Sequence, residues 1–321
     1  MNNTTVSIVI PTYTHPQWLG QALASSLMQT YKPVEIIVVS DGPQTTEAIQ
    51  AVARYPDLHF LQQDHSGAGV ARNTGLAASK GEFIQFLDDD DWLEPEAISA
   101  KMDVFKLHPD IGIVYSDIYL TSIDGITLGK YYDGFSRPLP CGDILKSLIK
   151  RNCILVHSPL WRRSVLIQAG GFPGRTGAED WELLVRCAEF TKFEYIDRPL
   201  GYYRLHNQNA TLDYKRQIKG EAAVQSYVVT TSRFNQVSPS NRARILSGYA
   251  FQQWLNGNAE LGIKFYEMAR KANPMHLYPI ILKIMMLLGR PIVQPMMRLI
   301  WKIRSMRRPS SAYYFLNQRE N

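Results

Sequence analysis

The sequence predicts an α/β protein followed by a helical C-terminal region. Three observations support this prediction: β-branched apolar runs, amphipathic stretches that alternate with them, and purely helical patterns beyond residue 211. Of the 321 residues, 45% are hydrophobic and 20% are charged, which excludes disordered, collagen-like and low-complexity chains. Because single hydrophobic cores stop growing at about 250 to 300 residues, we expect two domains, over 1–210 and 211–321.

Four runs in the first half are predicted to be buried strands because they are apolar and rich in β-branched residues. These runs are 6–10, 34–39, 58–62 and 82–87. Between them, apolar residues recur every three or four positions, which predicts crossover helices. The predicted helices lie near 17–28, 45–54 and 68–79. Strands that alternate with helices in this way are parallel and end at one edge of the sheet, where ligands bind.

Four consecutive aspartates follow the last of these strands: Asp88, Asp89, Asp90 and Asp91. Their mutual repulsion costs stability, and a bound cation would remove it. Carboxylates without adjacent His or Cys suit Mg²⁺ or Mn²⁺ held jointly with substrate phosphates. The alternative is a solvated turn, which an isolated pair of aspartates would fit better than four in a row behind an apolar strand.

A glycine-containing segment, from His65 to Gly81, precedes that strand. Its spacing matches neither the dinucleotide-binding fingerprint nor the P-loop. Gly67 and Gly69 would let the backbone turn into a helix, whose N-terminus would face the aspartates and bind phosphate together with Arg72. The alternative is that Arg72 pairs with a surface carboxylate.

Six segments follow one another along residues 6–211: VSIVIPTY, VEIIVVSDG, GAGVARNTGL, FIQFLDDDDWLEPEAI, GAEDWELLVR and YYRLHNQNAT. In order and spacing they resemble the motifs of glycosyltransferase family 2 enzymes with a GT-A fold. The resemblance implies a Rossmann-like catalytic domain over residues 1–210. It also implies an inverting, hexosyltransferase-type enzyme that moves a sugar from a nucleotide diphosphate sugar, a UDP-sugar by default, to a saccharide or lipid-linked acceptor. Polysaccharide or glycolipid synthesis at a bacterial cell envelope is the broad expectation.

The resemblance further implies roles for individual residues. Positions that border the nucleotide are Pro11, Thr12, Tyr13, Asp41, Arg72 and Asp89. A divalent metal, Mn²⁺ or Mg²⁺, would bind the DxD residues Asp88 and Asp90, and His206 would approach it. Arg204 would meet phosphate from a segment that closes over the donor. Thr14 and Pro43 stand where the family usually has Asn and Ser, which bears on the choice of nucleoside.

The motif GAEDWELLVR supplies the predicted general base. Displacement at an anomeric carbon needs a carboxylate opposite the leaving group, and Asp180 lies far enough along the chain to approach from another wall. Glu179 would hold its surroundings or the acceptor, and Trp92 and Trp181 are candidates for stacking on sugar rings, with core packing at least as strongly favoured. The alternative for Glu179 and Asp180 is an acidic first helical turn.

Two other functions are compatible with part of these motifs. A nucleotidyltransferase also combines a nucleotide-binding sheet with acidic metal ligands, but it would lack the GAEDWELLVR motif at this distance. A non-catalytic scaffold with a decayed transferase domain is the second alternative. The presence of Asp41, Asp88, Asp90 and Asp180 argues against decay.

Cysteine usage and the first residues predict the compartment. Cys141, Cys153 and Cys187 are odd in number and widely spaced, matching neither a disulfide framework nor a zinc site. The opening residues MNNTTVSIVI lack the basic region of a signal peptide. We therefore expect a cytoplasmic protein.

The C-terminal region is predicted to be helical and strongly basic. Residues 248–274 have small and aromatic residues placed as in one tetratricopeptide-like helix pair. Residues 268–319 contain ten Lys or Arg and no Asp or Glu, which gives this segment a charge of +10. Because the whole chain has a net charge of +6, the rest of the chain has a net charge of −4. A basic segment of this kind indicates an anionic partner.

Residues 277–308 of this region combine cations with Ile, Leu and Met, but no run reaches the about 18 uncharged residues of a spanning helix. We predict interfacial helices with one polar and one apolar face. Gln294, Arg298 and Lys302 form the polar face, and Met296, Leu299, Ile300 and Ile303 the apolar one. The hypothesis is peripheral contact with the anionic inner face of a membrane. The alternative is packing on the catalytic domain, and nucleic acid is not expected because stacking aromatics are few.

Overall fold

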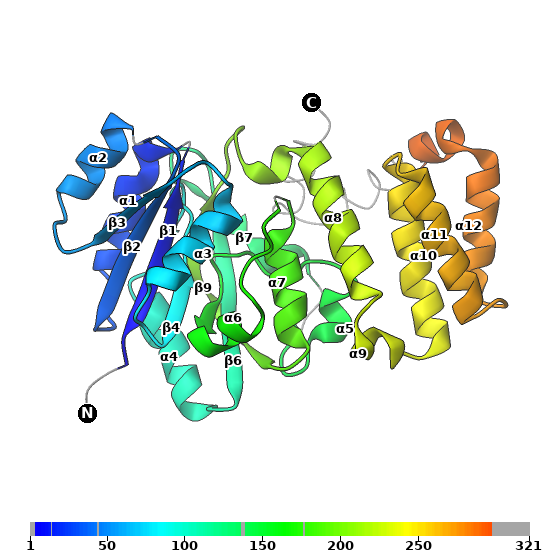
Figure 1. Cartoon of the computed structure of the whole chain (residues 1–321), viewed down its shortest axis with the longest axis horizontal. Coiled ribbons are helices and arrows are strands. Elements are labelled where there is room, and N and C mark those ends of the chain that lie inside the picture. The colour runs from blue at the N-terminus through cyan, green and yellow to red at the C-terminus, as the bar shows by residue number, and fades with distance from the viewer. Residues whose placement is uncertain (1–3, 14, 44, 136–138, 176, 297–321) are drawn as a thin grey trace. The chain divides into compact units, whose positions relative to one another are not determined.

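The computed structural model describes residues 4–296 except 14, 44, 136–138 and 176. Thr14 and the predicted helix positions Arg298, Leu299, Ile300, Lys302 and Ile303 lie outside the described residues. The chain divides into two compact units, Met1–Leu212 and Asp213–Asn321 (Figure 1).

The first unit begins with parallel strands joined by helices, as the sequence predicts. The strands are β1 (Val6–Thr12), β2 (Val34–Asp41), β3 (His59–Gln63) and β4 (Phe83–Phe86). The connecting helices are α1 (Pro16–Leu27), α2 (Thr46–Ala53) and α3 (Ala68–Ala78). Strands β2 and β4 flank β1, and β3 lies beyond β2, all in parallel register. The carboxyl ends of these strands therefore meet at one edge of the sheet.

The sheet continues with strands that the sequence analysis did not identify, and it is mixed rather than wholly parallel. Its order is β3-β2-β1-β4-β8-β6-β9-β5, with β7 paired to β6. The added strands are β5 (Trp92–Leu93), β6 (Ile111–Thr121), β7 (Thr127–Lys130), β8 (Leu160–Arg162) and β9 (Lys192–Arg204). The other helical elements are α4 (Ala97–Leu107), η1 (Tyr131–Gly134), α5 (Leu145–Leu148), α6 (Arg163–Gln168), α7 (Glu179–Ala188) and η2 (Ala210–Leu212). Strand β8 is antiparallel to both of its neighbours, β4 and β6.

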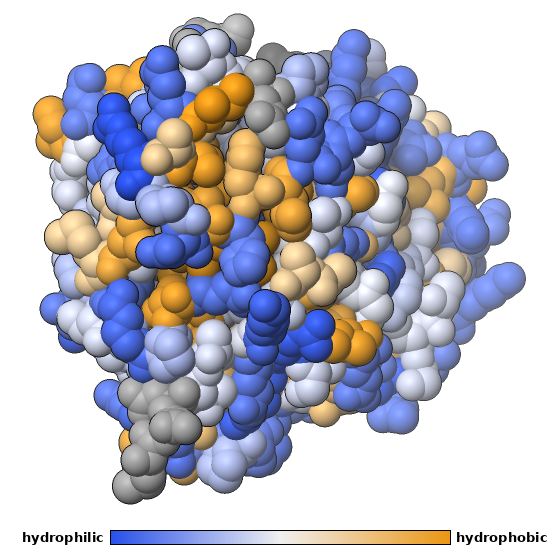
Figure 2. Space-filling model, turned by 60° about the vertical axis from the view of Figure 1, so that its left-hand side comes forward, coloured by the Kyte–Doolittle hydropathy of each residue, from blue (hydrophilic) through white to orange (hydrophobic). Residues whose placement is uncertain are grey.

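Helices cover both faces of this sheet. Alternate side chains of β1, such as Ile8 and Ile10, join a buried core with residues of α1, α2 and α4. Val9 points the other way, toward α3, whose Gly75 lies against it. On the face shown in Figure 2, many hydrophobic residues gather near the centre and hydrophilic residues border them.

Gly75 is predicted to be essential for the close contact between α3 and β1. A Cβ at this position would lie 2.3 Å from Val9 Cγ1, a distance that real Cβ atoms do not tolerate. We expect Gly75→Ala to lower the free energy of unfolding by about 1–3 kcal/mol through overpacking. Gly20→Ala in α1 is the matched control, because nothing lies within 4 Å of its Cβ position. Chemical denaturation of both variants checks the prediction, and equal stabilities would contradict it.

The second unit is entirely helical in its described part. Its helices are α8 (Tyr214–Val228), α9 (Ser232–Asn235), α10 (Pro239–Leu255), α11 (Ala259–Ala272) and α12 (Leu277–Leu288). Helices α10 and α11 form the predicted helix pair, joined at Gly257, which has a φ of +90°. No single described helix has the length and apolar composition needed to cross a membrane. The bent pair Leu277–Leu288 and Arg290–Met296, at 115°, meets those two criteria jointly.

All three cysteines are free thiols. Cys153 and Cys187 are buried, and Cys141 is exposed. Burial raises the pKa of Cys153 to about 11 and also raises that of Cys187. The two buried thiols are therefore unreactive near neutral pH.

Candidate active site

The four aspartates turn in one loop after β4, at the carboxyl edge of the sheet. The Asp91 amide donates to the Asp88 carbonyl at 3.2 Å, which closes the loop. Their side chains form two groups: Asp89 and Asp90 both lie near His15, and Asp88 and Asp91 both lie near His157. The run of four therefore supplies two separate binding positions rather than one.

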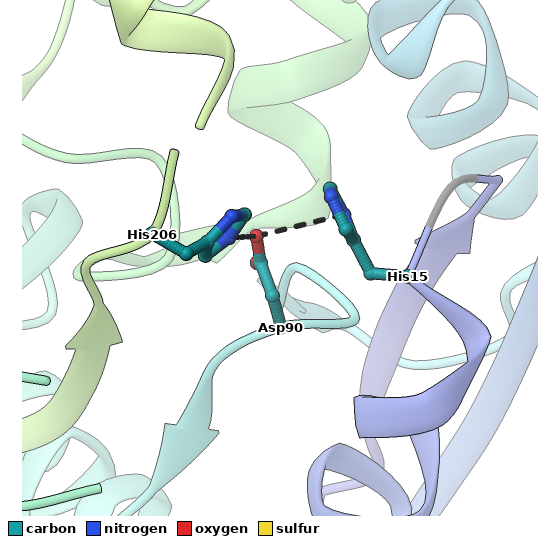
Figure 3. Close-up of side chains that lie close together, drawn as sticks. All are labelled: His15, Asp90 and His206. Carbon is teal, nitrogen blue, oxygen red and sulfur yellow. Dashed lines mark hydrogen bonds and ion pairs between the residues drawn. The ribbon is translucent and has the colours of Figure 1, made fainter. Parts of the chain in front are cut away.

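Asp90 meets two imidazoles that come from opposite ends of the first unit (Figure 3). His206 Nε2 lies 2.9 Å from Asp90 Oδ2, and His15 Nδ1 lies 3.8 Å from the same oxygen. One ligand atom from each of these residues lies within 4.8 Å of the others, and all three residues are buried. Two imidazoles and a carboxylate form a donor set that divalent first-row metals accept.

Asp88 lies outside this group of three, although the sequence analysis placed it with Asp90 as a metal ligand. Its Oδ1 instead accepts a hydrogen bond from Arg72 Nη2 at 2.5 Å. Burial opposes ionisation, but the Arg72 guanidinium outweighs it and lowers the pKa of Asp88. Asp88 forms a second group of potential ligands with Asp91 and His157.

A buried polar network supports the aspartate loop from beneath. Asp91 accepts from the Arg204 amide at 2.9 Å and lies 3.1 Å from His157 Nδ1. The His157 carbonyl accepts from Gln85, which in turn accepts from the ammonium of Lys101. Burial lowers the pKa of His157 to about 4 and that of Lys101 to about 7. The imidazole of His157 is therefore neutral at pH 7, whereas Lys101 is about half protonated there.

The predicted base, Asp180, stands in the first turn of α7. Its Oδ1 accepts from the Trp181 amide at 2.8 Å, and its Oδ2 accepts from Asn152 Nδ2 at 3.0 Å. Burial, helped by the neighbouring Glu179 carboxylate, raises the pKa of Asp180 to about 6. A carboxyl with this pKa is mostly ionised at pH 7 and is a stronger base than an ordinary aspartate.

Arg72 connects α7, the helix that carries Asp180, to the loop of the four aspartates. It bonds Asp88 on one side, and its Nη1 lies 3.9 Å from Glu179 Oε1 on the other. Glu179 also accepts from the Gly177 amide at 2.7 Å, so it anchors the turn that precedes the base. The alternative of a surface ion pair is wrong for Arg72, because its side chain is buried in this position.

The residues assigned to the nucleoside lie at the ends of β1 and β2. Thr12 Oγ1 donates to Asp89 Oδ2 at 2.6 Å, next to the buried Pro11. Tyr13 is 45% exposed and stacks on His65, with ring centroids 4.1 Å apart. An exposed aromatic face of this kind can stack on a base.

Asp41 is tied to the turn before α3. Its carboxylate accepts from the Ser66 and Gly67 amides, each at 2.8 Å, and from Gln63 Nε2 at 2.7 Å. These bonds hold in place the turn that Gly67, with a φ of +96°, makes into the helix.

Two residues that were predicted to contact the substrates, Trp181 and Arg204, instead contact other parts of the protein. Trp181 is only 4% exposed and donates to the Leu148 carbonyl, so core packing holds and stacking on a sugar ring is wrong. Arg204 is buried, bonds the Asp90 and Ile123 carbonyls and Gln21, and lies over the Trp92 ring. Its guanidinium braces the aspartate loop.

The sequence analysis missed three residues of this site: His15, Asn152 and His157. None of them belongs to a spaced ligand motif. His15 directly follows the PTYT segment at the end of β1, and that position at the sheet edge was the one available signal. Asn152 and His157 precede β8, a strand that the analysis did not find, so no signal placed them at the site.

Comparisons with known proteins identify the family of this chain. The family model described as glycosyl transferase family 2 matches residues 7–134. An uncharacterized glycosyltransferase of Rickettsia typhi is 30% identical over 227 residues, which cover 69% of this chain and 70% of the relative. Another, of Rickettsia conorii, is 25% identical and covers 90% of this chain. The chain spans 48% of that relative's length.

Solved structures show the same fold. The TarS 1–349 structure of S. aureus, in complex with UDP-GlcNAc, has a TM-score of 0.61 at 16% identity, covering 84% of this chain and 81% of that one. The mannosyltransferase PcManGT of Pyrobaculum calidifontis, in complex with GDP-Man and Mn²⁺, has a TM-score of 0.55 at 16% identity, covering 88% and 80%. The first unit therefore has the GT-A fold that the sequence predicts. With the family match and the Rickettsia typhi relative, this establishes that the chain is a glycosyltransferase of family 2.

Proposed function

We propose that this enzyme transfers a sugar from a UDP-sugar to an acceptor hydroxyl with inversion, using Asp180 as the general base. The observation that carries the proposal is the Arg72 bridge. It links the aspartate loop, through Asp88, to the turn that presents Asp180, through Glu179. Donor and base groups thus belong to one connected site. UDP-sugar is the default donor, and TarS in complex with UDP-GlcNAc supports it by analogy.

The protein groups perform a single displacement. The acceptor oxygen bonds to the anomeric carbon as its proton passes to an Asp180 carboxylate oxygen. The bond between the anomeric carbon and the diphosphate oxygen breaks, and the diphosphate leaves with the electron pair. Asn152 holds the carboxylate in position, and Arg72 places positive charge beside the aspartate loop.

His15, Asp90 and His206 are the residues that would hold a divalent metal. The fit rests on their donor set and on the convergence of three buried ligand atoms within 4.8 Å. A metal held there would neutralise charge on the donor diphosphate, and the two imidazoles suit Mn²⁺ better than Mg²⁺, which prefers oxygen ligands. The presence of Mn²⁺ in the PcManGT complex supports this assignment by analogy.

Product formation tests the proposal directly. The full chain is incubated with UDP-, GDP- and dTDP-sugars, and release of the nucleoside diphosphate is measured with saccharide and lipid-linked acceptors. We expect release from UDP-sugars in the presence of Mn²⁺, and acceptors of cell-envelope polysaccharide or glycolipid type to stimulate it. Release from GDP-sugars alone would overturn the choice of nucleotide, and binding without turnover would favour a scaffold.

The raised pKa of Asp180 predicts the pH dependence of the reaction. Only the ionised carboxylate accepts a proton, so kcat/KM should rise as pH increases through about 6 and level off above it. Removing the Asn152 amide takes away a hydrogen bond that favours the ionised form. We therefore expect Asn152→Ala to raise the pKa and move this rise to higher pH.

Asn256, whose Oδ1 accepts from Tyr214 in the second unit, supplies the matched control as Asn256→Ala. Profiles are recorded at saturating Mn²⁺ for the wild type and both variants. If the pH profile of Asn152→Ala coincides with that of the wild type, Asp180 does not control the rise of kcat/KM with pH.

A further inference from the structure

Helix α12 carries an apolar face that the described chain leaves exposed. We define the α12 apolar face as Leu277, Tyr278, Ile280, Ile281, Ile284, Leu287 and Leu288. The exposed fractions of these residues run from 42% at Ile281 to 78% at Leu287. Ordinary surfaces carry large apolar residues singly, whereas these seven are gathered on twelve residues of one helix.

Helical geometry places all of these residues except Tyr278 on the side of α12 away from its packing partners, and Tyr278 lies at the border, four positions before the buried Leu282. Pro279 and Leu282 are buried where α12 packs on α10 and α11. Positions 277, 281, 284 and 288 follow the i, i+4, i+7, i+11 spacing of one helix face, opposite to the buried pair. After Gly289 the short helix Arg290–Met296 buries Val293 and leaves Ile292 58% exposed, so apolar exposure continues beyond the bend.

The positive charge around the α12 apolar face favours an anionic binding partner. Lys283 and Arg290 are exposed next to the α12 apolar face, and Arg270 and Lys271 close α11. Residues 268–319 contain no Asp or Glu. An apolar helix face bordered by cations matches an anionic lipid surface, in which apolar side chains enter the acyl boundary and cations meet the headgroups. A second copy of this chain would bring the same positive charge and repel it.

We propose that the α12 apolar face docks this enzyme onto an anionic membrane surface, with the helix lying along the interface. This goes beyond the proposed transfer reaction, and its test requires no activity. Docking would hold the enzyme in the layer where lipid-linked acceptors are displayed. It also gives the expected peripheral membrane location a named structural element.

Vesicle flotation of the full chain tests the proposal. The probes are phosphatidylcholine vesicles with and without about one third phosphatidylglycerol. We expect binding to the anionic vesicles and much weaker binding to the neutral ones. Removal of an apolar side chain should cost about tenfold in partitioning, so Ile284→Asn combined with Leu287→Asn should abolish flotation.

Two further variants separate the possible causes. Lys283→Gln with Arg290→Gln should weaken binding to anionic vesicles by about tenfold or more and leave binding to neutral vesicles unchanged. Leu107→Asn is the matched control, because Leu107 is 75% exposed on α4 and should not affect binding.

Several outcomes would overturn the proposal. Flotation that survives the Ile284 and Leu287 substitutions would place the contact elsewhere. The protein could also form a dimer in sedimentation and fail to bind vesicles. If the Ile284 and Leu287 substitutions abolish that dimer, a second copy of the chain covers the α12 apolar face. A large fall in thermal stability of that variant would show that the chain itself covers the face. Binding that resists alkaline carbonate would indicate insertion across the bilayer.

Discussion

Asp180→Asn is expected to lower kcat by about 10²–10⁴-fold, because Asn cannot accept the acceptor proton. The substitution keeps the shape of the side chain and removes only the basic group. Binding of the nucleotide should change little, since the Asp180 carboxylate accepts hydrogen bonds from Asn152 and the Trp181 amide, away from the aspartate loop. Steady-state kinetics with calorimetric titration of UDP separates the two effects.

Asp103→Asn on α4 is the matched control, because Asp103 is 66% exposed and pairs only locally with Lys106. Its kcat should equal that of the wild type. If Asp180→Asn retains more than about a tenth of wild-type kcat, the base lies elsewhere and the single-displacement assignment fails. Loss of UDP binding in the same variant would instead place Asp180 on the donor side.

Asp90→Asn should abolish the metal-dependent part of nucleotide binding. Loss of partners around a metal ligand already costs about 10–100-fold in affinity, so removal of the carboxylate itself should cost at least the upper end of that range. Calorimetric titration with UDP, GDP and dTDP, each with Mn²⁺ and with EDTA, measures the effect. We expect one nucleotide to bind the wild type with Mn²⁺, and no enhancement by Mn²⁺ in the variant.

Asp110→Asn serves as the control, because Asp110 forms an exposed pair with Lys192. His15→Gln should weaken the Mn²⁺ effect as well, since His15 belongs to the same group of three. An undiminished Mn²⁺ effect in Asp90→Asn would move the metal to the group of Asp88, Asp91 and His157.

The first four strands could be predicted because each is a compact run with apolar residues. Strands β1, β2 and β4 are buried as predicted, whereas β3 is partly exposed because it forms the edge of the sheet, so the predicted burial of that run is wrong. Strand β6 is a buried apolar run of the same kind, and β9 was missed for a physical reason. They pair in parallel across about eighty residues of sequence, a relation that no local pattern shows. In β9, Pro199 and Gly201 interrupt the apolar pattern, and its register with β6 shifts at several positions.

In the candidate active site too, the sequence predicts some features and not others. The sequence motif locates all four aspartates, but their partners come from other elements and decide what each carboxylate does. Thr12 donates a hydrogen bond to Asp89, Arg72 donates one to Asp88, and the His206 ring contacts Asp90. For Trp181 the sequence left stacking on a sugar ring and core packing both open, and the structure shows core packing. Its burial is set by packing of α7 against α5, which the local sequence does not encode.

The single exposed cysteine makes this enzyme directly suitable for site-specific conjugation. Cys153 and Cys187 are buried with raised pKa values, so a maleimide reagent near pH 7 should modify Cys141 alone. The unmodified sequence thus offers one attachment point for a fluorophore or a surface linker, with no need to remove the other two thiols.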